Sequence, residues 1–360
     1  MNTPSKKILI DLERLRYPNT GLANVFKNLA KGILQYQPTL DITYFGTPKT
    51  VRKISEQLRV LPFRHWHRFY ESFSQTFDII HLSNQGSVYF QQAYPYTQKI
   101  LTLHDLNFLH EDLSSYKRER LLQRVNANLR NTQYLVCISD FVKQDVLKNA
   151  SLLHLDKLKE LLVIHNGIVL PAPQTYSLEG KLAFLKERKY LLNIGVLFNK
   201  KNQKSLVEML PYTNEDLVLV TSEQKGSYAS EVKEAIARLG LAHRVHFLNN
   251  VTEAEKNALL QHAVGLCQPS LAEGFGIPPI EAMAFGKPIF LSTYTSLPEI
   301  GGKEAFYFRS FNPEEMAATV RQGLETFWSN KEASTRLKER AAEFNHLAMA
   351  QKYLALYNRI

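Results

Sequence analysis

The stretch that decides the fold runs Gln268-Pro-Ser-Leu-Ala-Glu-Gly-Phe-Gly-Ile-Pro-Pro-Ile-Glu-Ala-Met-Ala-Phe-Gly-Lys-Pro288. It follows an apolar run at 264–268 that is typical of a buried strand. Two adjacent prolines suit the first turn of a helix, and the closing Gly-Lys-Pro suits its end. The stretch therefore predicts a strand, a glycine-containing loop and a helix, in the order found in open parallel sheets.

Similar apolar runs recur along the chain with helix-length intervals between them. Most are continuously apolar rather than alternating, as in parallel strands that are buried on both faces. We therefore predict an α/β protein built from two doubly wound, Rossmann-like domains. The predicted strands are 7–11, 42–46, 78–82, 99–103, 134–138, 161–165, 190–195, 217–222, 244–248, 264–268, 288–292 and 305–308.

The length of 360 residues also favours two domains, because one hydrophobic core rarely grows that large. The segment 166–177 contains a glycine and two prolines without hydrophobic periodicity, which is typical of a hinge. We expect an N-terminal Rossmann-like domain at 1–172 and a C-terminal Rossmann-like domain at 173–340. A final helix at 341–360 is expected to pack back towards the N-terminal domain.

The composition, 44% hydrophobic and 22% charged, is that of an ordinary globular protein. No run of 18 apolar residues occurs, and the apolar run near the start is too short for a signal peptide. We therefore expect a cytoplasmic protein. Cys137 and Cys267 stand far apart in apolar surroundings, so we expect two buried core residues and no metal or disulfide framework.

Two carboxylates stand eight residues apart in the opening stretch. Glu273 falls in the loop and Glu281 in the helix, so both side chains can reach one ligand. A carboxylate accepts hydrogen bonds from vicinal sugar hydroxyls. Gly274 and Gly276 let the backbone approach closely, and a helix start offers N–H groups to an anion. The pattern predicts a site for hydroxyls and phosphate; two unrelated surface glutamates at a tight turn are the alternative.

The stretch closely resembles the Glu-x7-Glu signature of the retaining glycosyltransferases of family 4. That family has the GT-B fold, in which two Rossmann-like domains face each other across a cleft. By resemblance the domain at 1–172 binds the acceptor and the domain at 173–340 binds the nucleotide sugar. The resemblance implies that Glu273 contacts the donor sugar and that Glu281 binds the ribose of the nucleotide. It also implies that the loop backbone meets the sugar and the diphosphate, through Gly274, Phe275, Gly276 and Ile277.

Two further elements resemble the family in the same order along the chain. The segment 193–202 is similar to its Gly-x-x-x-x-Arg-Lys-Asn loop, with Lys200 where arginine is usual and Lys201 at the lysine. By resemblance these ammonium groups stabilise the departing diphosphate, although Lys200 lacks the fork of arginine. The alternative is a solvent-exposed basic turn. His104 matches the family's His-Asp-Leu element, which lines the cleft near donor sugar and acceptor.

Three positions match less closely. Gly21 is the one glycine kept in the loop 17–24, where the family has a glycine-rich loop that approaches the phosphates. Asn250 and Val251 border the base by resemblance. The family often has glycine where the neighbouring Asn249 and the segment 221–223 stand, which bears on base selectivity rather than on the fold.

The net charge of +10 is uneven, because residues 1–172 hold 22 basic and 14 acidic side chains, a net of +8. Segments 51–73 and 116–130 mix basic with apolar and aromatic residues. That mixture suits an anionic inner-membrane surface or a phosphate-bearing acceptor; nucleic acid and an ordinary solvated helix face are the alternatives. On the family frame we expect an acceptor or membrane surface rather than nucleic acid. Its predicted residues are Arg64, Trp66, Arg68, Lys117, Arg118 and Arg120.

The resemblance implies a retaining hexosyltransferase with His104, Glu273 and Lys201 as catalytic residues. It would move a hexose from a nucleotide sugar to a glycan or lipid-linked acceptor in lipopolysaccharide, O-antigen or capsule biosynthesis. GDP-mannose ranks first as donor, and a UDP-sugar-dependent glucosyl, galactosyl or N-acetylglucosaminyl transferase is the alternative. No Asp-x-Asp occurs, so neither metal nor other cofactor is expected.

Three other classes compete with the transferase reading. A nicotinamide-dependent dehydrogenase would need Gly-x-Gly-x-x-Gly after the first strand, and this chain lacks it. A nucleotide-sugar epimerase or phosphorylase would share the architecture. A noncatalytic protein that binds anionic surfaces would use the basic half and would have no need of Glu273 and Lys201.

Overall fold

The computed structural model describes residues 5–17, 21–36, 39–69, 76–111, 113–222 and 226–360. The chain divides into two compact units, Met1–Val169 with Phe344–Ile360, and Leu170–Glu343. The first crossing between units lies inside the predicted hinge segment 166–177, and the second lies close to residue 340.

The first unit is built on a seven-stranded parallel sheet with the order β3-β2-β1-β4-β5-β6-β7. Its inner strands β1, β4, β5 and β6 are largely buried on both faces, as the continuously apolar runs predict. The strands of this sheet are β1 (Lys7–Asp11), β2 (Asp41–Gly46), β3 (Arg59–Pro62), β4 (Ile79–Leu82), β5 (Gln98–Leu103), β6 (Tyr134–Cys137) and β7 (Glu160–Val163). The helices are η1 (Glu13–Arg16), α1 (Gly21–Tyr36), α2 (Pro48–Val51), η2 (His65–Arg68), η4 (Asn107–Leu109), α3 (Ser115–Leu129), α4 (Asp140–Lys148), η5 (Ala150–Leu152) and α12 (His346–Arg359).

The second unit is built on a six-stranded parallel sheet with the order β10-β9-β8-β11-β12-β13. Its strands are β8 (Tyr190–Ile194), β9 (Asp216–Val220), β10 (Val245–Leu248), β11 (Gly265–Gln268), β12 (Ile289–Ser292) and β13 (Phe306–Phe308). Its helices are η6 (Gly180–Leu185), η7 (Asn199–Lys201), α5 (Gln203–Met209), η8 (Leu210–Tyr212), α6 (Ser227–Arg238), α7 (Glu253–His262), α8 (Ile277–Ala284), α9 (Leu297–Gly301), η9 (Gly302–Glu304), α10 (Pro313–Ser329) and α11 (Ala333–Ala342).

Both sheets place their third, second and first strands on one side and their later strands on the other, which is the dinucleotide-binding order. The strands predicted from apolar runs are all present, with ends shifted by one or two residues. The sequence missed β3, because this edge strand carries the exposed Arg59 and Pro62 and has no continuously buried run.

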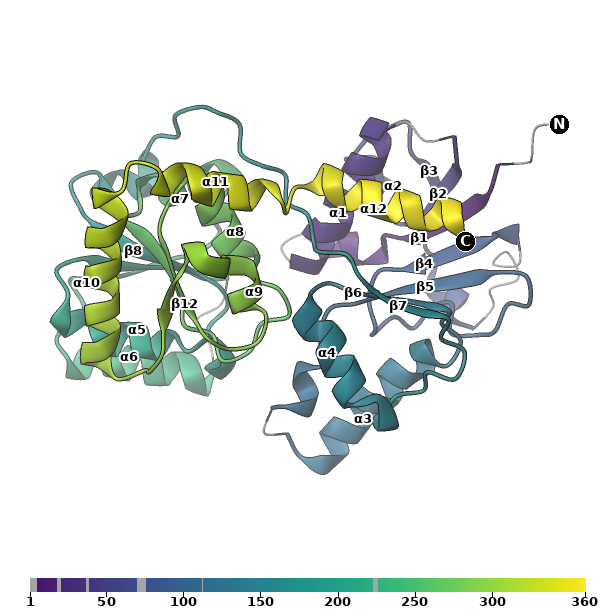
Figure 1. Ribbon diagram of the computed structural model, residues 1–360, viewed down its shortest axis with the longest axis horizontal. Coiled ribbons are helices and arrows are strands. Elements are labelled where there is room, and N and C mark those ends of the chain that lie inside the picture. Colours follow the sequence, from purple (N-terminus) through teal and green to yellow (C-terminus); the bar gives the residue numbers. More distant parts are fainter. Residues whose placement is uncertain (1–4, 18–20, 37–38, 70–75, 112, 223–225) are drawn as a thin grey trace. The chain divides into compact units, whose positions relative to one another are not determined.

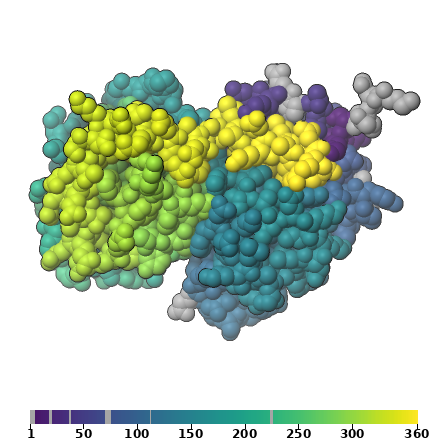
Figure 2. Space-filling model, viewed as in Figure 1, coloured from purple at the N-terminus to yellow at the C-terminus, as the bar shows by residue number. Residues whose placement is uncertain are grey.

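The last helix, α12, belongs to the first unit, although 174 residues of the second unit precede it in the chain. It packs along α1 (Figure 1), and its outer side forms part of the face that Figure 2 shows. The two backbones approach so closely that a Cβ at Gly32 would lie 2.7 Å from the Cβ of Ala350. The side chains of α12 also reach the sheet, since Tyr357 Oη lies 2.7 Å from Nδ1 of the buried His81.

Within the part of the chain that the structure describes, no helix is long and apolar enough to cross a membrane.

Candidate active site

The strand order of the second unit brings two loops together at one point of its sheet. β8 and β11 are neighbours, and the chain leaves them towards opposite sides of the sheet, which is where doubly wound sheets bind ligands. The loop after β8 carries Lys200 and Lys201, and the loop after β11 carries Glu273. A backbone bond joins the loops directly, because Leu271 N–H donates to the carbonyl of Lys200 at 2.7 Å.

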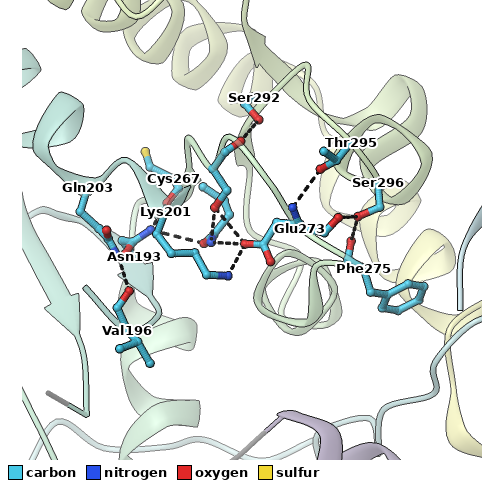
Figure 3. Close-up of polar contacts among 12 residues, drawn as sticks. Asn193, Val196, Lys201, Gln203, Cys267, Glu273, Phe275, Ser292, Thr295 and Ser296 are labelled. Atoms are coloured by element: carbon cyan, nitrogen blue, oxygen red, sulfur yellow. Dashed lines mark hydrogen bonds and ion pairs between the residues drawn. The ribbon is translucent and has the colours of Figure 1, made fainter. Parts of the chain in front are cut away.

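The carboxylate of Glu273 is the centre of this site (Figure 3). Its Oε1 accepts from Lys201 Nζ at 2.6 Å, from Ser270 Oγ at 2.8 Å and from Gln268 Nε2 at 2.9 Å. The side chains of Lys201 and Glu273 are 20% and 11% exposed, so the ion pair is largely shielded but still reachable from solvent. The basic loop after β8 and the carboxylate after β11, which the sequence analysis treats separately, therefore meet in the structure.

The backbone on either side of Glu273 is held by the loop before α9. Glu273 N–H donates to Thr295 Oγ1 at 3.0 Å, and Ser296 Oγ–H lies 3.0 Å from the carbonyl of Glu273 and 2.7 Å from that of Phe275. Thr295 itself has a left-handed backbone, with φ of 55°, which a side chain other than glycine adopts at a cost of about 1–3 kcal/mol. The loop conformation is thus imposed from a second segment of the chain.

The loop that leads into α8 differs from the expectation in its donors. Pro278 and Pro279 occupy the first turn of α8 and have no N–H, so the donors at this helix start are confined to the backbone up to Ile277. Gly276, with φ of 116°, has a backbone that favours glycine. Phe275 is 4% exposed, and its ring points away from the carboxylate of Glu273 (Figure 3).

Glu281 lies within α8, where the sequence predicts it. Its Oε1 accepts from Lys256 Nζ of α7 at 2.7 Å, and Lys256 also pairs with Glu253 at 2.9 Å. Burial raises the pKa of Glu281, and the nearby Lys256 opposes that rise. Burial alone would lower the pKa of Lys256, but its two ion pairs outweigh burial and leave that pKa raised.

Asn250 and Val251 follow β10 and stay close to the surface. Asn250 adopts a left-handed backbone with φ of 47°, and Lys181 Nζ donates to its carbonyl at 3.0 Å. The same ammonium lies 3.2 Å from Glu255 Oε2 at the start of α7. Through these contacts Lys181 of η6 connects the loop expected to border the base with the start of α7.

His104 follows β5 in the first unit, and its ring is fixed by neighbours. Its Nε2–H donates to the carbonyl of Ser83 at 2.8 Å, and Ser83 Oγ–H donates to Asp11 Oδ2 at 2.9 Å. Because a carbonyl only accepts, Nε2 carries the proton and Nδ1 keeps a lone pair. Burial lowers the pKa of His104, which favours the neutral ring at pH 7.

Arg64, Trp66 and Arg68 follow β3 and are exposed. Arg16, which was not among the residues predicted for this surface, lies next to them. Its guanidinium is 5.3 Å from the ring of Phe63 and 4.8 Å from that of Tyr17. Arg68 likewise lies 4.4 Å from the ring of Phe69. The arginine–aromatic surface, beyond the ends of β1 and β3, is defined here as Arg16, Tyr17, Phe63, Arg64, Trp66, Arg68 and Phe69. Arg16 also pairs with the buried Glu13 at 2.6 Å. Residues 70–73 of the predicted basic segment lie outside the described residues.

Lys117, Arg118 and Arg120 are exposed on the first turns of α3, which Figure 1 shows well apart from β3. The six predicted surface residues thus form two separate groups rather than one. Gly21 is the exposed first residue of α1. Residues 18–20 of its loop, and Glu223 of the segment 221–223, lie outside the described residues.

The second unit brings together Lys201 and Glu273 from separate loops and pairs Glu281 with a lysine; His104 and Gly21 belong to the first unit. Sequence reasoning missed Gln268, Ser270 and Lys256. A signal existed for Gln268, because a glutamine that ends the apolar run Val-Gly-Leu-Cys-Gln has no reason to be buried unless it has polar partners. None existed for Lys256, which looks like any helical surface charge.

Comparison with known proteins agrees with this geometry. Residues 177–344 match the family model of glycosyl transferases group 1. The chain is 24% identical over 218 residues to the O-antigen chain mannosyltransferase RfbU of Salmonella typhimurium, which covers 60% of this chain and 57% of that protein. It is 24% identical to the O-antigen chain mannosyltransferase B of Escherichia coli, covering 68% of this chain and 66% of the relative.

The chain thus spans less than two thirds of the length of either relative. Among solved structures, that of Anabaena Alr3699/HepE in complex with UDP and glucose superposes with a TM-score of 0.78 at 18% identity. It covers 99% of this chain and all of the other. Residues 177–344 are therefore a domain of the glycosyl transferases group 1 family, and the chain as a whole has the GT-B fold of two Rossmann-like domains.

Proposed function

We propose that this protein is a retaining glycosyltransferase of family 4 that moves a hexose from a nucleotide sugar to a glycan or lipid-linked acceptor. GDP-mannose is the first-ranked donor, and lipopolysaccharide, O-antigen or capsule biosynthesis is the proposed setting. The observation that carries the proposal is the convergence of the loops after β8 and β11, which sets Lys201 Nζ 2.6 Å from Glu273 Oε1 at the ligand-binding edge of the sheet.

Two features of the site suit a nucleotide sugar. Glu273 and Glu281 supply acceptors for sugar and ribose hydroxyls, respectively. Lys201 holds Glu273 with one N–H of an ammonium that has three, so it keeps donors for the diphosphate. Lys201, with Lys200 in the same turn, would stabilise the charge that grows on the departing diphosphate without a metal ion.

The proposed reaction keeps the anomeric configuration without a covalent intermediate. The acceptor hydroxyl oxygen bonds to the anomeric carbon from the face that the diphosphate leaves, while the bond from that carbon to the diphosphate oxygen breaks. The acceptor proton passes to the departing diphosphate. In this scheme Glu273 positions the sugar and stabilises its oxocarbenium character, and neutral His104 offers Nδ1 to a hydroxyl.

The acceptor is assigned to the first unit, which carries most of the excess charge. The arginine–aromatic surface lies where the strands end, offers guanidinium groups to phosphate and offers rings to sugar faces. The exposed basic turns of α3, with Tyr116 78% exposed, suit peripheral contact with an anionic inner membrane from the cytoplasmic side.

A UDP-sugar donor is the second candidate, and one observation favours it. The solved structure with a TM-score of 0.78 was obtained in complex with UDP and glucose. The curated mannosyltransferase relatives favour the GDP-mannose assignment instead.

A panel of nucleotide sugars tests both candidates. GDP-mannose, UDP-glucose, UDP-galactose and UDP-N-acetylglucosamine are each assayed for thermal stabilisation and for slow donor hydrolysis. We expect GDP-mannose to raise Tm by several degrees and to be hydrolysed, with loss of hydrolysis in Glu273→Gln. Glu231→Gln, which alters an exposed ion pair with Lys204 in the same unit, is the matched control. Stabilisation by none of the four donors would refute the proposed function.

A further inference from the structure

The carboxylate of Glu273 is asymmetric in its contacts. Lys201, Ser270 and Gln268 all donate to Oε1. Among the residues that the structure describes, each side-chain donor to this carboxylate reaches Oε1 and not Oε2. One oxygen is therefore saturated by the protein, and the other is left for a ligand.

Two of the three donors are buried residues without a charge. Gln268 is 1% exposed at the end of β11, and Ser270 is fully buried two residues later. Gln268 Nε2 lies 3.0 Å from Ser270 Oγ as well as 2.9 Å from Glu273, so the three side chains form a closed triangle of hydrogen bonds. Neither side chain carries a charge, and a buried donor is costly to leave without a hydrogen-bond acceptor.

Residues further back orient this pair. Asn193 in β8 donates through Nδ2 to the carbonyl of Cys267 at 2.8 Å and lies 3.3 Å from Gln268 Oε1. The amide oxygen of Gln268 is thereby turned towards Asn193, and its NH2 group is turned towards Glu273. Ser292 in β12 donates to the backbone carbonyl of Ser270, which holds the segment after β11 in place.

We propose that Gln268 and Ser270 are positioning residues that pin Oε1 of Glu273 and present Oε2 to the hydroxyls of the donor sugar. The inference rests on the proposed function and deepens it. Lys201 is shared between Glu273 and the diphosphate, so its hold on the carboxylate weakens whenever it turns to the phosphates. Gln268 and Ser270, unlike Lys201, do not also bind the diphosphate in this scheme. They therefore keep Glu273 in place throughout the reaction.

A double-mutant cycle tests this role. Gln268→Met keeps the length of the side chain and removes its hydrogen bonds, Ser270→Ala is a second and smaller change, and Gln261→Met, at an amide that contacts residues 174–176, is the control. We expect Gln268→Met and Ser270→Ala each to lower kcat for donor hydrolysis about 10- to 100-fold, with the Kd for the nucleoside diphosphate unchanged within about twofold. In the Glu273→Ala background neither change should lower kcat further.

Equal losses in both backgrounds, or a loss of nucleoside diphosphate affinity by the same factor as kcat, would overturn the role. A simple packing defect would give those results, because it would weaken the whole loop rather than the placement of one carboxylate. Ser270→Ala keeps the test decisive if Gln268→Met does not fold.

A second readout needs no turnover. The side-chain amide protons of Gln268 are followed by NMR in labelled protein. Glu273→Ala should shift them and speed their exchange with water at least tenfold, whereas Glu281→Ala should leave them unchanged. If Glu273→Ala leaves the Gln268 amide unaffected, the positioning role is wrong. If the amide responds but no nucleotide sugar is turned over, the proposed function fails while the anchoring of Glu273 stands.

Discussion

The two units repeat one strand order but collect different chemistry where their strands end. Beyond β8 and β11 the second unit gathers carboxylates, each paired with a lysine, in Lys201–Glu273 and Lys256–Glu281. Beyond β1, β3 and β5 the first unit gathers a neutral histidine and arginines stacked on aromatic rings. The shared topology determines where a ligand binds, and the loop residues determine which ligand it is.

The difference also concerns charge balance. In the second unit Glu273 and Glu281 are each paired with a lysine. Residues 1–172 carry a net charge of +8, which attracts anions without directed contacts. Substitutions in the two units should therefore affect different quantities, and the expected effects differ in size.

The largest effect is expected at Glu273. Glu273→Ala should lower turnover by about 10²- to 10³-fold, since a preorganised group facing developing charge is worth that much. Nucleoside diphosphate affinity should change little, because Glu281 and the lysines remain. Steady-state kinetics and calorimetric titration measure the two quantities, with Glu231→Gln as control. A parallel loss of nucleotide affinity would contradict the separation of the role of Glu273 in turnover from the role of Glu281 in nucleotide binding.

Glu281→Ala should act on binding instead, weakening nucleotide affinity by about 10- to 100-fold through the loss of charge-assisted hydrogen bonds.

Lys256→Met should make the nucleotide affinity pH-dependent. Burial raises the pKa of Glu281, and removing Lys256 lets it rise further. Affinity should therefore fall as pH drops through this raised pKa, because the protonated carboxyl loses acceptor capacity. Titrations between pH 8 and pH 5 check this, and a flat profile would contradict it.

The first unit should lose stability in mild acid through His81. Burial lowers the pKa of His81 to about 3, while the unfolded chain titrates near its ordinary value of about 6.5. Below about pH 6.5 only the unfolded state takes up this proton, so the free energy of unfolding falls with pH by up to about 1.4 kcal/mol per unit. Roughly 2 kcal/mol should be lost by pH 5.

Trp66 lies in the first unit and Trp328 in the second, so urea unfolding followed by fluorescence in a Trp328→Phe background reports on the first unit. His81→Gln should be less stable at pH 7 and should show a shallower loss between pH 7 and pH 5. The same slope in both proteins would assign the acid sensitivity to other histidines.

The smallest effect is expected at the arginine–aromatic surface. Arg68→Gln should raise the acceptor KM by about 3- to 10-fold, which corresponds to the loss of one charge-assisted contact of about 1 kcal/mol. The donor KM should not change. Lys49→Gln, at a basic residue of α2 outside this surface, serves as control. A change in the donor KM rather than in the acceptor KM would contradict the assignment of the acceptor to the first unit and of the donor to the second.

Much of the fold could be predicted because parallel strands buried on both faces leave continuous apolar runs, as at Leu191 and Leu217. The edge strand β3 leaves no such run, so it was missed. At the candidate site, Glu273, Glu281 and Lys201 were identifiable because a glycine-containing loop and a basic turn each follow a strand. Lys256 could not be found, because the sequence does not show which side chain α7 turns towards α8.

The sequence alone determined the α/β class, the segment in which the chain passes from the first unit to the second, and the residue types that could bind a nucleotide sugar. Those features depend on local periodicity and on motif spacing. Only the tertiary structure decided how they are used. Residues 72 positions apart, Lys201 and Glu273, meet because β8 and β11 pair in parallel. Gln268 donates to that carboxylate because burial obliges its amide to find partners, and Asn193 of the neighbouring strand β8 occupies its oxygen.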